Sequence, residues 1–279
     1  RCFRCRFSCC PSRATFLTGQ YSHNNTVWTN GNTYDGRGGG YGALLPTMDN
    51  TLPVWLEKSG YHTGLIGKYV NGYGQNVAPT NIPPGWKTWF GLVDPSTYSF
   101  YNYTVNDNGM LRTYGNWTQD YQTDVLSSTA VDFINDRADS SQPFFLWLAP
   151  LAPHSGAPGN AVPEPAPRHK GFFSNLPLPQ PPNFNEGNFS DKPQFIKNNL
   201  PLMDSSKLDL TTKSYRTRRE SLLAVDEMVA KVINALQATG KLDNTYIIFT
   251  SDNGYFQGEH RVPTDKFLVY EESIHIPLI

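Results

Sequence analysis

A continuous apolar run at residues 144–148 (FFLWL) constrains the fold of this chain more than any other stretch. A strand with one face in water alternates apolar and polar side chains, whereas a parallel strand covered on both faces is apolar throughout. The run therefore predicts a parallel strand buried between layers of helices. Residues 51–66 agree, because a helix pattern ends at Gly60 and a strand pattern follows it directly, which is the element order of an α/β fold.

Further helix and strand patterns continue this order along the chain. Residues 120–137 and 215–238 carry apolar side chains at helical spacing. Residues 246–249 (YIIF) predict another buried strand. Two irregular regions separate these elements: the aromatic, Asn/Gly-rich residues 71–117 predict short hairpins and loops, and the Pro/Asn-rich residues 156–205 predict an excursion over the surface.

Polar side chains stand where three of the predicted strands end. Lys68 follows the first strand and His154 follows the apolar run. Asp252 and Asn253 follow the third strand, and a carboxylate beside an amide suits a divalent cation such as Ca²⁺. In open α/β sheets, ligands bind beyond the carboxyl ends of the strands. The sequence therefore predicts a ligand site at this edge of the sheet.

The N-terminal stretch at residues 9–13 (CCPSR) combines a thiol, a proline, a hydroxyl and a guanidinium. Pro11 suits the first turn of a helix, so Cys9 is expected just before a helix N-terminus. Backbone N–H groups and the helix dipole favour an anion there, and Arg13 carries a two-pronged donor for the same anion. The stretch therefore has the parts of a nucleophile beside an anion site.

Taken with Lys266 further along the chain, these groups indicate one kind of chemistry. Cations and a metal site around a nucleophile favour hydrolysis of an anionic ester, because the transition state carries negative charge on its peripheral oxygens. Each residue alone also has an ordinary structural explanation. Asp252 and Asn253 are common turn residues, the lysines can be surface charges, and His154 can be a loop histidine bonded to the backbone.

Composition narrows the possible partners. The 279 residues carry a formal net charge of −1, which indicates neither nucleic acid nor an anionic membrane surface as a partner. The chain has no apolar run of about eighteen residues, so no membrane span is predicted. Asn-x-Ser/Thr sequons at Asn24, Asn102, Asn116 and Asn188 are weak indications of a secreted protein.

All four cysteines lie near the start of the chain, at positions 2, 5, 9 and 10. This clustering does not have the spacing of a disulfide framework that joins distant segments. A zinc site formed by Cys2, Cys5, Cys9 and Cys10 is an alternative, although zinc sites usually pair two separated knuckles.

Three segments resemble the sulfatase family. Residues 9–19 (CCPSRATFLTG) match the first sulfatase signature, and residues 60–68 (GYHTGLIGK) match the second. Residues 244–254 (NTYIIFTSDNG) match a third motif, and residues 67–73 (GKYVNGY) look like the N-acetylglucosamine-6-sulfatase and fungal arylsulfatase branch. The resemblance implies an alkaline-phosphatase-like α/β/α sandwich with a mainly parallel sheet. It also implies hydrolysis of sulfate esters to an alcohol or phenol plus inorganic sulfate.

The resemblance implies that Cys9 is the precursor of the nucleophile. A formylglycine-generating enzyme would oxidise Cys9 to an aldehyde during maturation. One hydroxyl of the hydrated aldehyde would attack sulfur and expel the alcohol, and the second would then eject sulfate. Arg13 would hold the hydrate, and Cys10 would be a bystander.

Roles for the remaining residues follow from the same resemblance. Lys68 and Lys266 would grip the sulfate oxygens, and His154 would bond to the sulfate or assist the leaving group. Asp252 and Asn253, with the modified cysteine, would ligate one Ca²⁺ ion. A small-molecule or saccharide sulfate ester would be the substrate, and the protein would enter the secretory pathway, either secreted or in a lysosome- or vacuole-like compartment.

This sequence departs from the family pattern in two places. Many relatives have a histidine two residues after the signature lysine, where this chain has Val70, so no base is assigned there. The family's first strand carries an Asp pair that completes the calcium site, but no acidic residue occurs before Asp35. Residues 1–279 are therefore expected to form one incomplete catalytic domain, truncated at both ends and lacking the first strand and the C-terminal subdomain, with residues 156–205 as an excursion within it.

Two other functions stay open on the sequence. A phosphodiester or phosphonate hydrolase of the same fold would use the same formylglycine. An inactive, truncated paralogue would fail to hold calcium. The sequence does not distinguish an aryl sulfate from a sulfated sugar as the natural substrate.

Overall fold

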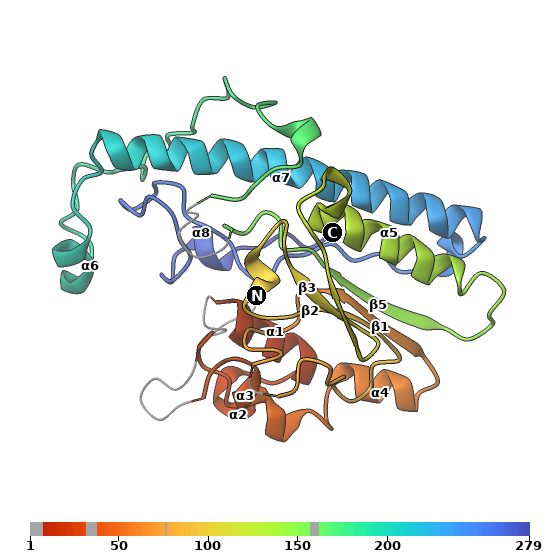
Figure 1. The fold of residues 1–279 in the computed structure, drawn as a ribbon. Coiled ribbons are helices and arrows are strands. Elements are labelled where there is room, and N and C mark those ends of the chain that lie inside the picture. Colours follow the sequence, from red (N-terminus) through yellow and green to blue (C-terminus); the bar gives the residue numbers. More distant parts are fainter. Residues whose placement is uncertain (1–7, 32–37, 76, 157–161) are drawn as a thin grey trace.

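A five-stranded sheet between two layers of helices forms the centre of the computed structural model, which describes residues 8–31, 38–75, 77–156 and 162–279 (Figure 1). The strand order is β4-β3-β2-β1-β5. The bounds of the strands are β1 His62–Gly67, β2 Thr88–Leu92, β3 Thr104–Asp107, β4 Met110–Thr113 and β5 Phe144–Ala149.

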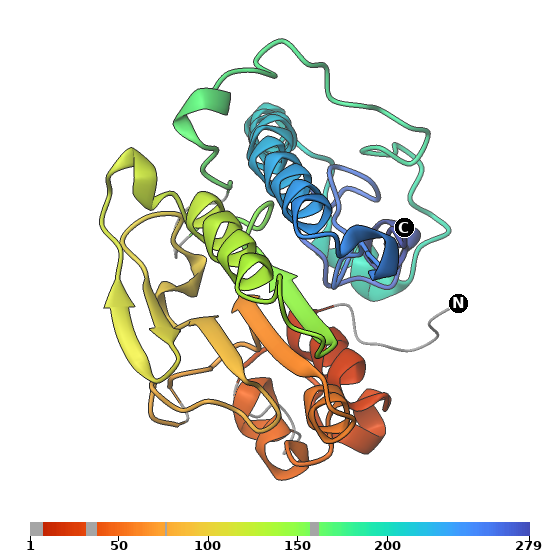
Figure 2. The same cartoon turned by 90° about the vertical axis from the view of Figure 1, so that its right-hand side faces the viewer.

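Helices cover both faces of this sheet. The α-helices are α1 Cys9–Thr18, α2 Ser22–Asn25, α3 Gly40–Leu44, α4 Leu52–Lys58, α5 Gln122–Asn135, α6 Gln194–Asn199, α7 Ser205–Ala238 and α8 Glu271–Ile274. The 3₁₀ turns are η1 Leu45–Thr47, η2 Ser96–Tyr98, η3 Thr118–Asp120, η4 Pro167–His169 and η5 Leu242–Asn244. Figures 1 and 2 show α5 and α7 side by side on one face of the sheet and α1 to α4 on the other.

The sheet is mixed and is parallel at its centre. β1 runs parallel to both β2 and β5, and the β3–β4 hairpin continues the sheet antiparallel from β2. Successive side chains of β1 point to opposite faces, so Leu65 packs with α1 and α3 while Ile66 packs with α5 and α7. The two apolar layers therefore hold the carboxyl ends of β1 and β5 at a common edge.

Several predicted elements are confirmed. The helix expected at the N-terminal motif is α1, although it begins at Cys9 rather than after it. The helix and strand expected at residues 51–66 are α4 and β1, and the helix expected at residues 120–137 is α5. The helix predicted at residues 215–238 begins earlier, at Ser205, where the Asp204 side chain accepts a hydrogen bond from the backbone N–H of Lys207.

The buried strand predicted at residues 246–249 is wrong. Tyr246 is 98% exposed and Ile248 is 69% exposed, and this stretch belongs to no strand of the sheet. Among the described residues, its backbone pairs only at Phe249, which exchanges two hydrogen bonds with Ile279. The apolar pattern indicates strand character, but burial also requires a neighbouring strand, and the described residues supply none.

The strand expected at residues 144–148 is β5, but it lies at an edge of the sheet in the described part of the chain. Residues 144–148 are half-buried rather than fully buried, because β1 is the only strand that pairs with β5 among the described residues. Conversely, β2 arises in the region for which only hairpins and loops were predicted, and its Trp89 is fully buried. A strand of five residues between glycines and prolines has too short a pattern to be identified by periodicity.

Two further predictions concern a zinc site and a membrane span. The zinc alternative relies on Cys2 and Cys5, which lie outside the described residues. Within the described ranges, no helix is both long and apolar enough to span a bilayer.

Candidate active site

Cys9 lies at the N-terminal end of α1 and is only 1% exposed. The Lys266 ammonium donates a hydrogen bond to Cys9 Sγ over 3.1 Å. The thiol itself donates to Asn253 Oδ1 over 3.7 Å. Groups from the two ends of the chain therefore meet at the sulfur atom.

Arg13, one turn further along α1, binds Asp252. Its Nε donates to Asp252 Oδ2 over 2.8 Å, and its Nη1 donates to the carbonyl oxygens of Lys68 and Tyr69 over 2.7 and 3.0 Å. Burial acts to raise the pKa of Asp252, but the charges of Arg13 and two lysines outweigh burial and hold this pKa well below its usual range. The side chain is therefore a carboxylate at neutral pH.

Lys68 enters the site because β1 and β5 end close together. Gly67 has φ +111°, and a Cβ at this position would lie 2.2 Å from the carbonyl oxygen of Ala149, so the approach requires glycine. The backbone N–H of Lys68 then donates to the same Ala149 carbonyl over 2.8 Å. This turn directs a lysine that is only 4% exposed into the interior.

The Lys68 ammonium lies against a tyrosine that the sequence did not single out. Its Nζ donates to Tyr98 Oη over 3.2 Å and lies 4.7 Å from the centre of the Tyr98 ring. Burial acts to lower the pKa of Lys68, but the neighbouring Cys9 and Tyr98 groups outweigh burial and raise it. The lysine therefore keeps its charge inside the protein.

His154 is neutral in this environment. Burial, followed by the charges of Lys266 and Lys68, lowers the pKa of His154 to about 3. Its Nδ1 lies 2.9 Å from the carbonyl oxygen of Ser155, which can only accept, so Nδ1 carries the proton. The Nε2 atom therefore presents a lone pair. The ring packs on Tyr98 with 5.1 Å between ring centroids.

The structure brings the residues singled out in the sequence into one cluster that suits an anion. Each of them contacts another member or acts on its charge; they are Cys9, Arg13, Lys68, His154, Asp252, Asn253 and Lys266. Two lysines and one arginine stand against one carboxylate, which leaves two positive charges in a largely buried space. Such an excess of charge attracts and holds anionic groups.

Cys10 faces away from this cluster. It is fully buried, its Sγ accepts a hydrogen bond from the backbone N–H of Asn71 over 3.2 Å, and burial raises the pKa of its thiol to about 12. Its backbone N–H donates to Asn30 Oδ1 over 2.9 Å. Cys10 is therefore an inert thiol that packs into the core.

Two aromatic residues complete the site without a signal in the sequence. Tyr98 contacts Lys68 and His154, and Trp147 of β5 lies under the Arg13 guanidinium, 5.5 Å from the ring centre. Tyr98 belongs to an aromatic-rich stretch in which no spacing distinguishes one tyrosine from the next. A polar residue after a strand was the useful signal, and neither aromatic residue has it.

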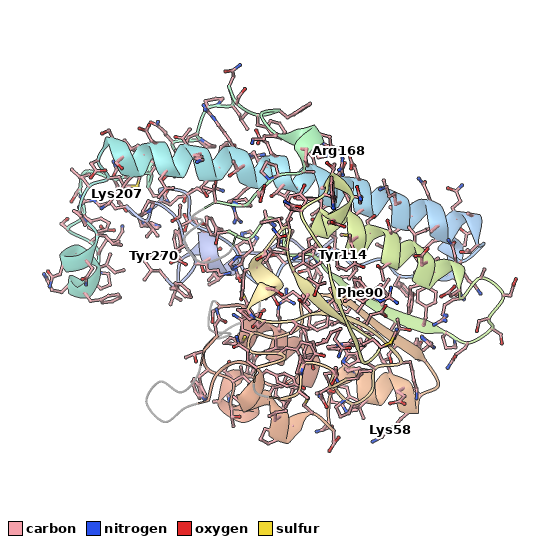
Figure 3. All side chains as sticks on the ribbon, in the orientation of Figure 1. Lys58, Phe90, Tyr114, Arg168, Lys207 and Tyr270 are labelled. Carbon is pink, nitrogen blue, oxygen red and sulfur yellow. The ribbon has the colours of Figure 1, made fainter. Side chains whose placement is uncertain are left out.

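A cavity of about 740 Å³ lies elsewhere, beside α5 and the β3–β4 hairpin. Phe90, Tyr114 and Arg168 belong to its lining and are labelled in Figure 3. Within this cavity, Arg168 donates to Asp124 over 2.7 Å and to Glu227 over 2.9 Å, so two carboxylates already pair with its charge. None of the seven site residues lines this cavity, so the cavity is separate from the cluster around Cys9.

Comparison with known proteins gives one consistent result. The family model described as Sulfatase matches residues 1–279. The chain is 39% identical to human N-acetylglucosamine-6-sulfatase, covering 97% of this chain and 48% of that protein, and 36% identical to an arylsulfatase of Volvox carteri, covering 97% and 43%. The solved structure of BT4656 in complex with its substrate D-glucosamine-2-N,6-O-disulfate superposes with a TM-score of 0.72 at 26% identity, covering 100% of this chain and 62% of that one.

Fold and sequence thus define an α/β protein whose structural neighbours include sulfatases, which confirms the predicted fold class. The chain belongs to the sulfatase family. It spans about half the length of the curated relatives that it matches.

Proposed function

We propose that this chain carries the catalytic groups of an enzyme that hydrolyses sulfate esters. The observation that supports this proposal most directly is the position of Cys9, buried at a helix N-terminus and hydrogen-bonded to Lys266 in a cluster with two excess positive charges. The reaction takes a sulfate ester and water to an alcohol or phenol, inorganic sulfate and a proton. Negative charge develops on the sulfate and leaving oxygens, so fixed cations stabilise the transition state.

Cys9 is the position that we assign to formylglycine. In the structure its Sγ is the atom that faces Lys266 and Asn253, whereas the Cys10 sulfur is held in the core. An aldehyde at this position supplies, as its hydrate, an oxygen nucleophile where a thiol would be expected. The helix N-terminus favours the partial negative charge of such an oxygen.

The other residues act on the substrate and on protons. Lys68 and Lys266 direct ammonium groups into the site, where they bind sulfate oxygens. His154 accepts a hydrogen bond at Nε2 rather than donating one, because its proton is on Nδ1. This assignment favours a role in accepting a hydrogen bond from a hydroxyl group over a role in gripping sulfate oxygens. Arg13 is committed to Asp252 through Nε and therefore also fixes that carboxylate.

The residues present fit a calcium ion only in part. Asp252 and Asn253 offer the oxygen donors that Ca²⁺ prefers, but the ion takes about six to eight oxygen ligands. Arg13 already binds one carboxylate oxygen, and Cys9 donates to the amide oxygen. Among the described residues, no group of three or more His, Cys, Asp or Glu side chains is arranged to hold a metal. Asp252 and Asn253 would thus hold one side of the ion, which would supply charge to polarise the sulfate.

A sulfated glucosamine unit is the substrate that we propose. Support comes from the relative named N-acetylglucosamine-6-sulfatase and from the neighbouring structure solved with D-glucosamine-2-N,6-O-disulfate. Entry into the secretory pathway is a linked proposal, because all four sequon asparagines, Asn24, Asn102, Asn116 and Asn188, are exposed and open to glycosylation.

Turnover of three matched esters tests the function. Protein matured with a formylglycine-generating enzyme and supplied with Ca²⁺ is assayed with an aryl sulfate, an aryl phosphate and an aryl phosphonate, and with glucosamine 6-sulfate. We expect sulfate ester turnover that Cys9→Ala abolishes and Cys10→Ala retains. Preference for a phosphate or phosphonate ester would replace the proposal with the phosphoryl alternative.

Calcium binding tests the third possibility, an inactive paralogue. Titration calorimetry with Ca²⁺ on the wild-type chain and on Asp252→Asn should show binding that the substitution weakens at least tenfold. No calcium binding together with no ester turnover would favour the inactive paralogue.

A further inference from the structure

Tyr98 touches two of the proposed catalytic side chains at once. Its Oη accepts a hydrogen bond from Lys68 Nζ over 3.2 Å, and its ring packs on the His154 imidazole with 5.1 Å between centroids. A lysine has four rotatable side-chain bonds and no intrinsic direction, so an acceptor at a fixed point decides where its remaining two N–H bonds lie. The histidine ring likewise needs a wall to hold its Nε2 in one direction.

The turn that carries Tyr98 is anchored on both sides. Ser96 Oγ donates to the Val93 carbonyl over 2.8 Å and accepts from the backbone N–H of Thr104 over 2.9 Å. The buried Gln122 side chain donates to the carbonyls flanking Tyr98, at Thr97 over 3.2 Å and at Ser99 over 2.8 Å. The ring is therefore held in place by the protein before any substrate binds.

The phenol also has hydrogen-bonding capacity to spare. Its oxygen is occupied by Lys68, and no acceptor for its own proton is present among the described residues. Burial raises the pKa of Tyr98, so the group stays a neutral phenol. A neutral acceptor beside Lys68 orients the ammonium without cancelling its charge, as a carboxylate would.

We propose that Tyr98 is a positioning residue of this site: its hydroxyl aims the Lys68 ammonium at the substrate anion, and its ring fixes the orientation of His154. The inference rests on the proposed function for its effect on catalysis. Its structural part, the coupling of Tyr98 to Lys68 and His154, does not depend on which ester is hydrolysed.

Matched substitutions separate the two contacts. Tyr98→Phe keeps the ring and removes the acceptor, whereas Tyr98→Leu removes both. Tyr101→Phe is the control, because Tyr101 lies three residues further on and packs on Tyr121 instead. We expect Tyr98→Phe to lower kcat/KM for the preferred ester about tenfold, mostly through kcat, while Tyr101→Phe stays within twofold of wild type.

Coupling to Lys68 is tested by the double variant. If the hydroxyl acts through Lys68, Tyr98→Phe has no further effect on turnover or on inorganic sulfate binding in a Lys68→Ala background. Equal losses in both backgrounds would show that the hydroxyl does not act through Lys68.

An NMR titration tests the contact with His154 without any turnover. The imidazole signals, assigned with His154→Gln, should keep their position in Tyr98→Phe and move in Tyr98→Leu, with protonation at a higher pH. Unchanged signals in Tyr98→Leu, or wild-type turnover and sulfate affinity in Tyr98→Phe, would overturn the inference while leaving sulfate ester hydrolysis intact. Absence of ester turnover in the wild-type protein would overturn the proposed function, and the titration and sulfate binding would still decide the role of Tyr98.

Discussion

Single residues in the site are held in defined charge states by their neighbours. Burial and the charges of Lys266 and Lys68 keep His154 neutral. The charges of Arg13, Lys68 and Lys266 keep Asp252 ionised against the effect of burial, because positive charges disfavour an imidazolium and favour a carboxylate. The result is one neutral imidazole and one carboxylate among three cations. This division of charge suits the binding of an anionic group.

The buried His154 makes folding depend on pH. Its pKa is about 3 in the folded protein against an ordinary value of 6.5, so between these values the unfolded chain binds a proton that the folded protein excludes. The unfolding free energy is therefore free of this penalty above pH 6.5, and it falls as the pH drops toward 3. We expect the unfolding free energy of wild type, relative to His154→Gln, to fall by about 1.4 kcal/mol per pH unit between pH 6 and pH 4. Denaturant melts at several pH values measure this difference in unfolding free energy. If the unfolding free energies of the two proteins changed in parallel with pH, the prediction would be contradicted.

Residues that follow strands were accessible to sequence reasoning, and their partners were not. Lys68 and His154 follow the parallel strands β1 and β5, which end at a common edge of the sheet. Asp252 follows an apolar stretch that is not a strand of the sheet, and its ion pair with Arg13 fixes it in the site. The pairing of Arg13 with Asp252 joins residues 239 positions apart, and only the packed structure determines it. Tyr98 was missed for the same reason, since its role comes from a contact and not from a local pattern.

A short helix, α8, holds two parts of the site together. The Ser273 hydroxyl donates to the Lys266 carbonyl over 2.5 Å, and the backbone N–H of Gly254 donates to the Ser273 carbonyl over 2.9 Å. A Cβ at Gly254 would lie 2.0 Å from the Glu272 carbonyl oxygen, so glycine permits the approach. The element thus connects the segment that follows Asn253 with the loop that carries Lys266.

Removal of the Ser273 hydroxyl should loosen Lys266 with little effect on the fold. We expect Ser273→Ala to lower the unfolding free energy by about 1 kcal/mol, since one buried hydrogen bond is lost, and to lower kcat/KM about tenfold. Glu271→Ala, an exposed position on the same helix, should change stability by less than about 0.5 kcal/mol. Equal effects of the two substitutions on kcat/KM would contradict a specific role for Ser273.

The whole molecule combines a well-covered sheet centre with an apolar surface at one side. Layers on both faces bury Leu65 and Ile66 completely, as the α/β pattern in the sequence predicted. By contrast, Tyr246, Ile248 and Leu278 expose most of their side chains. Sequence periodicity predicted the strand character of this region but could not specify which neighbouring strand covers it, because burial is a property of the assembled sheet.

Exposed apolar side chains of this kind should be detectable in solution. We expect the 279-residue chain to bind an apolar dye such as ANS in its folded state, and Ile248→Lys to reduce the dye fluorescence without lowering the melting temperature. Asn244→Lys adds the same charge at a neighbouring exposed polar position and should leave the fluorescence unchanged. Absence of dye binding by the folded wild-type chain would show that this surface is covered.

The mass of the peptide that contains position 9 tests whether Cys9 is the precursor of the nucleophile. Protein matured in a host with a formylglycine-generating enzyme is digested, and the peptide with Cys9 and Cys10 is sequenced by tandem mass spectrometry. We expect an aldehyde at position 9 and an intact thiol at position 10, in the same preparation that hydrolyses a sulfate ester. An unmodified Cys9 in a preparation that hydrolyses sulfate esters, or in one that hydrolyses none, would contradict the assignment of Cys9 as the precursor of the nucleophile.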